Sequence, residues 1–285
     1  MSVAEPLPRL QEILQKTVAY LRERGVDNAR RETEWLFCHA LDLERLQLYT
    51  RYDMLLGPEQ LAVLRQLVQR RARREPLAYL LGSQPFCGLE LQVDRRVLVP
   101  RPETEELVER ILADPALPAE EDLAVADIGT GSGAIALALA SHRPQWRVHA
   151  CDRSADALAV AAANAAALRL PVQLHAGDLH AALPSGPWRL LVANLPYISE
   201  GERALCDPEI AHEPQEALFA DDDGLALIAR LVGSAPDLLD EQGVLWLEHG
   251  FRHGPRVAEL ARGAGLQSQL YHDAAGLDRC TRISR

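Results

Sequence analysis

A chain of 285 residues that is 48% hydrophobic and 25% charged can bury one large core or two smaller ones, and two domains is the expectation. No apolar run approaches the roughly 20 residues of a membrane-spanning helix, and the opening MSVAEPLPRLQEILQKT lacks the basic start and apolar middle of a secretory signal. The net charge of −11 is uneven, because residues 1–85 carry +2 and residues 86–285, with 30 acidic against 17 basic residues, carry −13. A broad nucleic-acid surface on residues 86–285 is therefore disfavoured.

Residues 6–81 follow a helical period throughout, with breaks near Gly25, Asp42 and Gly57. The apolar residues at this spacing include Leu10, Ile13, Leu14, Val18, Leu21, Trp35, Leu36, Leu61, Leu64, Leu67 and Val68. We therefore predict a small helical domain over residues 1–85. The basic cluster from Arg70 to Arg74 closes a helix, where cations favour the negative end of the helix dipole, so we expect a solvated helix end there.

Residues 86–100 change to a period of about two, which indicates a β-hairpin linker. Its alternating residues are Phe86, Leu89, Leu91, Val93, Val97 and Val99. We expect the turn near residues 94–96 and the end of the hairpin at Pro100. A helix then begins near Thr104, because the glutamates around it suit the exposed N–H groups of a first helical turn.

Residues 101–285 alternate short apolar segments with helical ones. The strand-like segments are LAVADIG, RVHACD, VQLHAGD, WRLLVANLPY, GVLWLEH, LQSQLYHD and DRCTRISR. This alternation predicts an α/β fold with a mostly parallel sheet covered on both faces. Ligands bind beyond the carboxyl ends of such strands, so the residues that follow each strand are candidates for a site.

The segment VADIGTGSGAIALALA indicates a strand, a glycine turn and a helix, which lets a ligand approach the main chain closely. Its G-x-G-x-G spacing after Asp127 differs from the G-x-G-x-x-G of nicotinamide enzymes. Asp152 ends the next strand, where a carboxylate can accept both hydroxyls of a ribose. Asp178 follows the third strand and can receive the amine of an adenine, with Leu179 over the ring; an acidic loop residue is the alternative. These residues predict an adenosine ligand.

The pattern N-x-P-Y follows the fourth strand, at Asn194, Leu195, Pro196 and Tyr197, and is typical of methyltransferases that act on a planar nitrogen. An amide nitrogen is a poor nucleophile, so its site must fix its orientation. The side-chain oxygen of Asn194 and the main-chain carbonyl of Leu195 can accept its two N–H hydrogens. Pro196 restricts the residue before it, and Tyr197 can cover the planar group. A strand-ending turn with a tyrosine over the core is the alternative.

Taken together, these motifs resemble the peptide chain release factor glutamine methyltransferases, the HemK-like family. The resemblance runs along nearly the whole chain in the segments REPLAYLLGSQPFCGLEL, VLVPRPETEELVE, DIGTGSGAIALALA, HEPQEALFADDDGL and LWLEHG. That family usually has Asn-Pro-Pro-Tyr. Leu195 at the second position matches the Asn-Leu-Pro-Tyr form of rRNA adenine dimethyltransferases.

The resemblance implies a Rossmann-like class I methyltransferase sheet over residues 101–285, with S-adenosyl-L-methionine as cofactor. It implies methylation of the glutamine amide in the Gly-Gly-Gln tip of class I release factors, which residues 1–85 help to grip, with no direct nucleic-acid or membrane partner. The implied cofactor-binding residues are Asp127, Gly129, Thr130, Gly131, Ser132, Gly133, Asp152, Asp178, Leu179 and Asn194. The implied substrate-binding residues are Asn194, Leu195, Pro196 and Tyr197, with the catalytic role on Asn194, Pro196 and Tyr197.

Three other functions stay open: glutamine methylation of a ribosomal protein, N6-adenine methylation of a nucleic acid, and a non-catalytic adaptor that keeps the cofactor for folding. The five cysteines are scattered and form no CxxC pair, which suits unpaired thiols in a reducing compartment and predicts a soluble, cytoplasmic protein. The nine histidines form no ligand spacing, so we expect no metal site.

Overall fold

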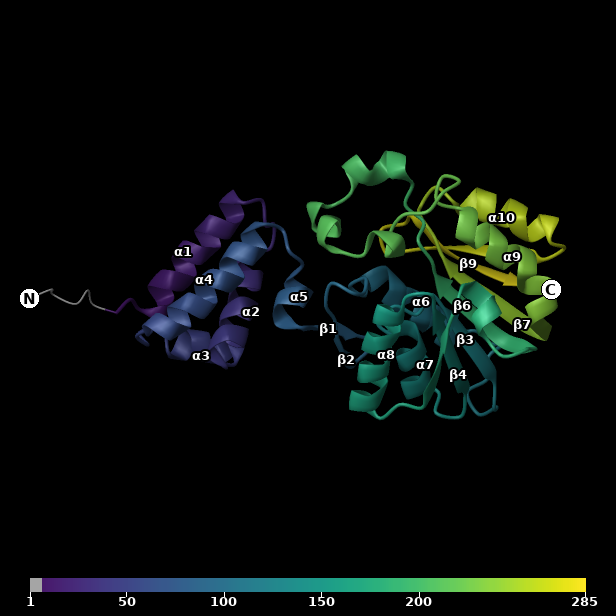
Figure 1. The fold of residues 1–285 in the computed structure, drawn as a ribbon, viewed down its shortest axis with the longest axis horizontal. Helices are drawn as coiled ribbons and strands as arrows, with labels where there is room; N and C mark the ends of the chain where they lie inside the picture. Colours follow the sequence, from purple (N-terminus) through teal and green to yellow (C-terminus); the bar gives the residue numbers. More distant parts are fainter. Residues whose placement is uncertain (1–6) are drawn as a thin grey trace, which may run out of the picture. The chain divides into compact units, whose positions relative to one another are not determined.

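The computed structural model describes residues 7–285, which form two compact units divided between Gly82 and Ser83 (Figure 1). Residues 1–6, which open the predicted helical domain and the stretch judged to lack a secretory signal, lie outside the described residues. The division falls slightly before the predicted boundary at residue 85. Within the described range, no helix combines the length and the apolar character needed to cross a bilayer.

The unit that ends at Gly82 is made of helices, as the period predicts. They are α1 (Leu10–Glu23), α2 (Ala29–Leu41), α3 (Arg45–Thr50), α4 (Pro58–Ala72) and α5 (Leu77–Leu81). Their apolar stripes meet in two buried clusters, one around Leu21, Leu36 and Leu67 and the other around Leu10 and Phe37. The unit therefore has a core of its own.

The basic cluster at the end of α4 is only in part the solvated helix end that we expected. Arg71 is only 2% exposed and pairs with Glu32 of α2. The Arg70 guanidinium donates to Glu75, with 2.8 Å between Nε and Oε2, and Arg74 donates to the carbonyl of Gly25. The partners of Arg71 and Arg74 lie 39 and 49 residues away in the chain, so a local charge argument could not predict these two contacts. Arg71 is therefore part of the buried interior of this unit, whereas Arg73 is exposed and Arg70 and Arg74 are partly exposed.

The predicted hairpin exists, but its turn lies earlier than expected. Strands β1 (Ser83–Phe86) and β2 (Leu89–Gln92) pair antiparallel around Cys87 and Gly88, which have φ of +47° and +79°. Two consecutive positive φ values make the tight two-residue turn that matches strand twist. A turn does form at residues 94–97, where the Val97 N–H donates to the Asp94 carbonyl at 3.1 Å, but it is not the hairpin turn. The expected strand over Val97 and Val99 is wrong. Residues 93–101 have no regular structure, and their valines alternate because they are buried.

The larger unit contains a seven-stranded sheet in the order β5-β4-β3-β6-β7-β9-β8, parallel except where β9 pairs with β7 and β8. Its strands are β3 (Ala124–Ile128), β4 (Arg147–Asp152), β5 (Val172–Ala176), β6 (Trp188–Asn194), β7 (Leu239–Glu248), β8 (Gln267–His272) and β9 (Asp278–Ser284). Its α-helices are α6 (Pro102–Leu112), α7 (Ala134–His142), α8 (Ala155–Leu168), α9 (Ala226–Leu238) and α10 (Gly254–Gly263). The predicted α/β class with a mostly parallel sheet is confirmed.

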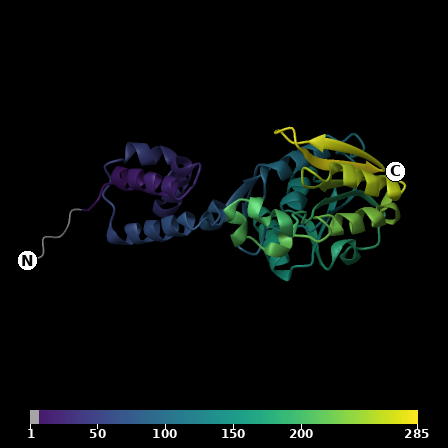
Figure 2. The same ribbon diagram turned by 90° about the horizontal axis from the view of Figure 1, so that it is seen from above.

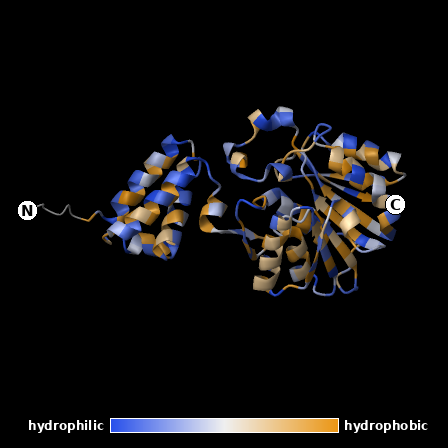
Figure 3. Ribbon diagram, in the orientation of Figure 1, coloured by the Kyte–Doolittle hydropathy of each residue, from blue (hydrophilic) through white to orange (hydrophobic). Residues whose placement is uncertain are grey.

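Both faces of this sheet are buried, because helices α6 to α8 cover one face and α9 and α10 the other (Figures 1 and 2). Along β6, Leu190 and Val192 join one core cluster while Leu191 and Ala193 join the other. Strands buried on both faces have continuous apolar runs, as residues 190–193 of β6 and 244–247 of β7 do, and Figure 3 shows hydrophobic bands along the sheet. Polar residues also end three of the parallel strands, with Asp152 at the end of β4, Asn194 at the end of β6 and Glu248 at the end of β7.

A run of short 3-10 helices is inserted between β6 and α9. Its members are η2 (Glu200–Leu205), η3 (Pro208–His212) and η4 (Gln215–Ala217), and a further turn, η1 (Leu179–Ala182), follows β5. A parallel bridge between Ile198 and Phe219 closes the base of the insertion. The insertion is thereby held at the carboxyl end of β6.

Candidate functional site

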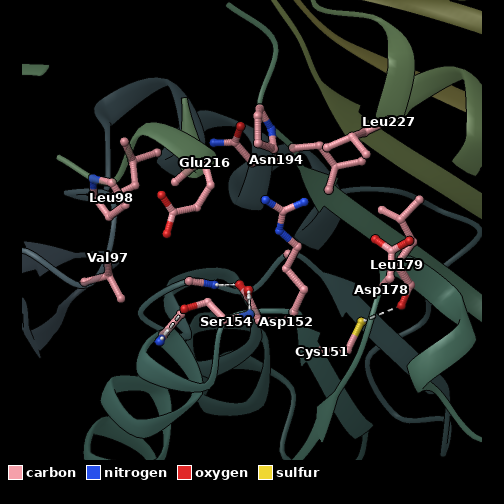
Figure 4. A pocket seen from close by; sticks show the side chains of 18 of the residues that line it. Val97, Leu98, Cys151, Asp152, Ser154, Asp178, Leu179, Asn194, Glu216 and Leu227 are labelled. Carbon is pink, nitrogen blue, oxygen red and sulfur yellow. Dashed lines mark hydrogen bonds between the residues drawn. The ribbon is translucent and has the colours of Figure 1, made fainter. Parts of the chain in front are cut away.

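A first hollow lies at the carboxyl ends of β3, β4, β5 and β6 (Figure 4). Its cavity volume is about 110 Å³, and it is open to solvent. The predicted cofactor residues that line it are Gly129, Gly131, Asp152, Asp178, Leu179 and Asn194. Four others, Asp127, Thr130, Ser132 and Gly133, are not among its lining residues. The predicted set therefore divides into a lining group and a supporting group.

The glycine loop after β3 needs glycine for two separate reasons. Gly129, Gly131 and Gly133 have φ of +79°, +56° and +84°, which side chains rarely adopt. A Cβ on Gly129 would also lie 3.0 Å from Cδ2 of Leu195, and one on Gly133 would lie 3.0 Å from Cδ1 of Leu137. The main chain of the loop is therefore left open to the first hollow.

Asp127, near the end of β3, is fully buried and is hydrogen-bonded to the glycine loop. Its Oδ2 accepts hydrogen bonds from Thr130 Oγ1 at 2.6 Å and from the Ala136 N–H at 3.2 Å. Burial raises the pKa of the Asp127 carboxyl to about 7. Its Oδ1 has no hydrogen-bond partner among the described residues, which leaves an acceptor that a bound donor or an ordered water would satisfy.

Asp152 at the end of β4 is held in place by two main-chain N–H groups. Its Oδ2 accepts from Gly131 and its Oδ1 from Ser154, both at 2.9 Å. Each carboxylate oxygen keeps a further lone pair, and the residue lines the first hollow (Figure 4). Asp152 can therefore accept hydrogen bonds from the two neighbouring hydroxyls of a ribose.

Asp178 lies beside the same hollow with a partner that sequence reasoning missed. Arg230 of α9 donates to its Oδ2 at 2.6 Å, and both side chains are about half exposed. The next residue, Leu179, is buried and presents its side chain to the hollow. The sequence contained no signal for Arg230, because 52 residues separate it from Asp178.

A second hollow adjoins the first and shares with it Leu98, Asn194, Leu195, Pro196 and Ala217. Its other lining residues come mainly from the insertion and include Arg101, Tyr197, Ile198, Cys206, Asp207, Glu209, Ile210, Leu218 and Glu248. The predicted substrate-binding segment 194–197 is thus part of the wall between the two hollows. Leu195 is only 3% exposed, and its side chain lies close to Gly129.

Asn194 and Tyr197 are joined through two buried residues that were not predicted as site residues. The Asn194 Nδ2 donates to Thr104 Oγ1 at 3.0 Å, and the Thr104 hydroxyl donates to Glu248 Oε2 at 2.7 Å. The Tyr197 hydroxyl donates to Glu248 Oε1 at 3.2 Å. Burial raises the pKa of Glu248 to about 7 and also raises that of Tyr197. Thr104 was interpreted only as part of a first helical turn.

Glu213 connects the insertion to the segment that precedes α6. Its side chain is fully buried, and it accepts a hydrogen bond from the Val99 N–H at 3.1 Å and one from the Arg101 guanidinium. These contacts tie the insertion to residues 99–101. Through them, Leu98 and Arg101 are fixed on the wall of the second hollow. Within residues 7–285, no group of three or more His, Cys, Asp or Glu could hold a metal ion.

Comparisons with known proteins show which families this chain is similar to. A family model described as PrmC N-terminal domain matches residues 12–82, and one described as Methyltransferase small domain matches residues 109–249. A release factor glutamine methyltransferase of Geobacter sulfurreducens is 41% identical over 95% of this chain and 94% of its own length. One of Deinococcus radiodurans is 39% identical over 97% and 99%.

Solved structures share the fold at low identity. A 16S rRNA N2 G1207 methyltransferase of T. thermophilus, in complex with AdoMet and guanosine, has a TM-score of 0.52 at 18% identity and covers 71% of this chain and 50% of that chain. A methyltransferase of Pyrococcus furiosus has a TM-score of 0.53 at 17% identity and covers 69% and 88%. At this identity the likeness supports the methyltransferase fold alone.

Proposed function

This chain belongs to the release factor glutamine methyltransferases, and we propose that the two adjoining hollows are its cofactor site and its acceptor site. The enzyme methylates the side-chain amide of a release factor glutamine with S-adenosyl-L-methionine as donor. We assign the acceptor to the glutamine of the Gly-Gly-Gln tip of class I release factors. The observation that carries this assignment is the Asn194 side-chain oxygen, which lacks a protein donor among residues 7–285 at the wall shared by both hollows.

The first hollow is the proposed cofactor site. S-adenosyl-L-methionine supplies an electrophilic methyl group on a cationic sulfur. We assign Asp152 to the ribose hydroxyls, Asp178 and Leu179 to the adenine, and the open main chain at Gly129 and Gly131 to the rest of the molecule. The buried Asp127, with Thr130, Ser132 and Gly133, supports the loop and has no direct contact in this assignment.

The segment from Asn194 to Tyr197 is the proposed acceptor site. An amide nitrogen is a weak nucleophile because its lone pair is delocalised into the carbonyl. Two acceptors, the Asn194 side-chain oxygen and the Leu195 carbonyl, take its two N–H hydrogens and so orient the nitrogen. Pro196 restricts Leu195 to extended conformations, which holds that carbonyl in one direction. The nitrogen would form the new N–C bond as the bond from the methyl carbon to sulfur breaks and leaves its electron pair on the sulfur, and the nitrogen would then lose a proton to solvent. Positioning therefore supplies most of the acceleration.

A nucleic-acid N6-adenine methyltransferase is the second candidate. Leu195 favours it, because the purine amine is also planar and Asn-Leu-Pro-Tyr occurs in adenine dimethyltransferases. The charge of the second hollow opposes it, since Asp207 and Glu209 line that hollow and would repel a phosphate backbone. We further propose a cytoplasmic enzyme with a protein partner and no nucleic-acid or membrane partner. All five cysteines are free thiols, which suits a reducing compartment.

The test is incubation with methyl-labelled cofactor and four acceptors: a class I release factor, the same factor with its Gly-Gly-Gln glutamine changed to alanine, purified ribosomal proteins, and protein-free RNA. We expect label on the unmodified factor alone, located on the glutamine by mass spectrometry. Label on the ribosomal proteins or on RNA would redirect the assignment to that acceptor. Asn194→Ala is expected to lower turnover by roughly 100-fold or more while the cofactor still binds.

A further inference from the structure

The amide of Asn194 is useful to the reaction in only one of its two orientations. A carboxamide presents an oxygen at one end and an NH₂ group at the other, and the two ends have nearly the same shape. With the oxygen toward the acceptor it can take a hydrogen from the substrate nitrogen. With the NH₂ group there, two donors would face each other. Something must therefore hold the amide in the productive orientation.

The register of the sheet places the candidate beside it. Asn194 ends β6 and is paired with Glu248, which ends β7. Thr104, in the first turn of α6, lies between their side chains and is hydrogen-bonded to both. Glu248 is 1% exposed and Thr104 is 5% exposed. Water therefore has little access to this chain of hydrogen bonds, and its direction is set by the groups themselves.

The direction follows from counting protons. An ionised Glu248 carboxylate can only accept, so the single hydroxyl proton of Thr104 must point to it. The Thr104 oxygen then has only lone pairs to offer on its other side. The group of Asn194 that faces Thr104 must therefore be its NH₂ group, and the 3.0 Å distance joins Asn194 Nδ2 to Thr104 Oγ1. The side-chain oxygen of Asn194 is then available to the acceptor. Reversing the amide would set two acceptors against each other.

The same carboxylate holds the other end of the motif. Tyr197 donates to the second oxygen of Glu248, so one buried group anchors both Asn194 and Tyr197. The charged groups around it act in opposite directions: Arg279 of β9 favours the ionised form, whereas Glu103 of α6 disfavours it. Burial has the largest effect and favours the neutral form. A protonated Glu248 can donate to Thr104, and the fixed direction is then lost.

We propose that Thr104 and Glu248 are positioning residues that lock the Asn194 amide with its oxygen toward the acceptor. This proposal rests on the proposed function of the acceptor site, and it assigns neither residue a contact with substrate. The lock lies in the hydroxyl of Thr104 and in the charge of Glu248. Changes that preserve shape but remove either feature should therefore reduce turnover without emptying the cofactor site.

The first experiment compares Thr104→Val with Thr104→Ser. Valine keeps the shape and removes the hydroxyl, so we expect kcat to fall by roughly 10- to 100-fold with little change in KM for the release factor. Serine keeps the hydroxyl and should restore kcat to within about 3-fold of the unmodified enzyme. Thr33→Val is the matched control, because Thr33 is another buried threonine that donates one hydrogen bond, to Ala29, within the helical unit. Equal kcat for the valine and serine variants at position 104 would overturn the proposal.

The second experiment separates the lock from folding and from the identity of the substrate. Calorimetry should give Thr104→Val an unchanged affinity for S-adenosyl-L-methionine. The NH₂ signals of the Asn194 side chain are assigned in ¹⁵N-labelled protein by their absence in Asn194→Ala. The hydrogens of this NH₂ group should exchange with solvent at least about 10-fold faster in Thr104→Val than in the unmodified protein. This readout needs no turnover, so it holds even where the unmodified enzyme fails to methylate the release factor. Unchanged exchange would refute the lock.

The third experiment uses the charge of Glu248. Because the ionised form is the locked one, kcat of the unmodified enzyme should fall as the pH drops through Glu248's pKa of about 7. Glu248→Gln cannot ionise, so its kcat should be lower and should lack this fall. A Glu248→Gln enzyme with the unmodified pH profile would contradict the proposal.

Discussion

Replacing Glu213 with alanine should loosen the insertion over the acceptor site without unfolding the sheet. The buried carboxylate accepts hydrogen bonds from the Val99 N–H and from Arg101. Its removal leaves the Val99 N–H unpaired, which costs about 1–3 kcal/mol. Arg101 is partly exposed and can turn to water, so the loss of its ion pair adds little. We therefore expect a local destabilisation of about 1–3 kcal/mol, far below the stability of the core.

The measurement is hydrogen exchange by mass spectrometry on peptides that cover residues 93–101 and 207–217. A local cost of that size corresponds to exchange faster by roughly 5- to 150-fold, whereas peptides from β3 and β6 should not change. Glu200→Ala is the control, because Glu200 lies in the same insertion but forms an exposed ion pair with Arg203. It should leave exchange in both peptides unaltered. Exchange in Glu213→Ala equal to that in the control would refute this account of the insertion.

Three further predictions concern the cofactor site. Gly133→Ala should lower the thermal unfolding midpoint by several degrees, because it combines a positive φ with a Cβ placed 3.0 Å from Leu137; Gly263→Ala, at a helical glycine with open space, should not. Asp152→Asn should weaken S-adenosyl-L-methionine binding by roughly 10- to 100-fold in calorimetry, and an unchanged affinity would remove Asp152 from the site. Asp127 has its pKa raised from 3.8 to about 7, so its contribution to stability is full below pH 3.8 and is lost as the pH rises through about 7. Asp127→Asn should accordingly gain unfolding free energy relative to the unmodified protein between pH 4 and pH 8 in urea titrations, and a constant difference would show that Asp127 does not titrate there.

The helical unit and the parallel sheet could be predicted from the sequence, because both depend on the spacing of apolar residues along the chain. Apolar residues at helical intervals identified the helices of the first unit, and the alternation of strands and helices identified the parallel sheet. The hairpin linker was predicted only in part from this spacing. Its valines at 97 and 99 are buried at alternate positions without any strand partner, and a period alone cannot distinguish these two causes.

The sequence likewise predicted some residues of the candidate site and missed others. Asp152, Asp178 and the segment Asn194 to Tyr197 each follow a strand, so the sequence predicted that they would gather at one edge of the sheet. Arg71 at the end of α4 was misjudged as solvated, because its partner Glu32 lies 39 residues away on another helix. Arg230 was not predicted beside Asp178 for the same reason.

The sequence by itself determined which backbone the site would have, since glycine conformations, proline restriction and strand periodicity are properties of neighbouring residues. Only the tertiary structure decided which side chains support it. Thr104 stands 90 positions before Asn194 and 144 before Glu248, and it meets both only because α6 packs over the ends of two adjacent strands. The direction of a hydrogen bond depends on which groups share a buried space, and that is settled when the chain has folded.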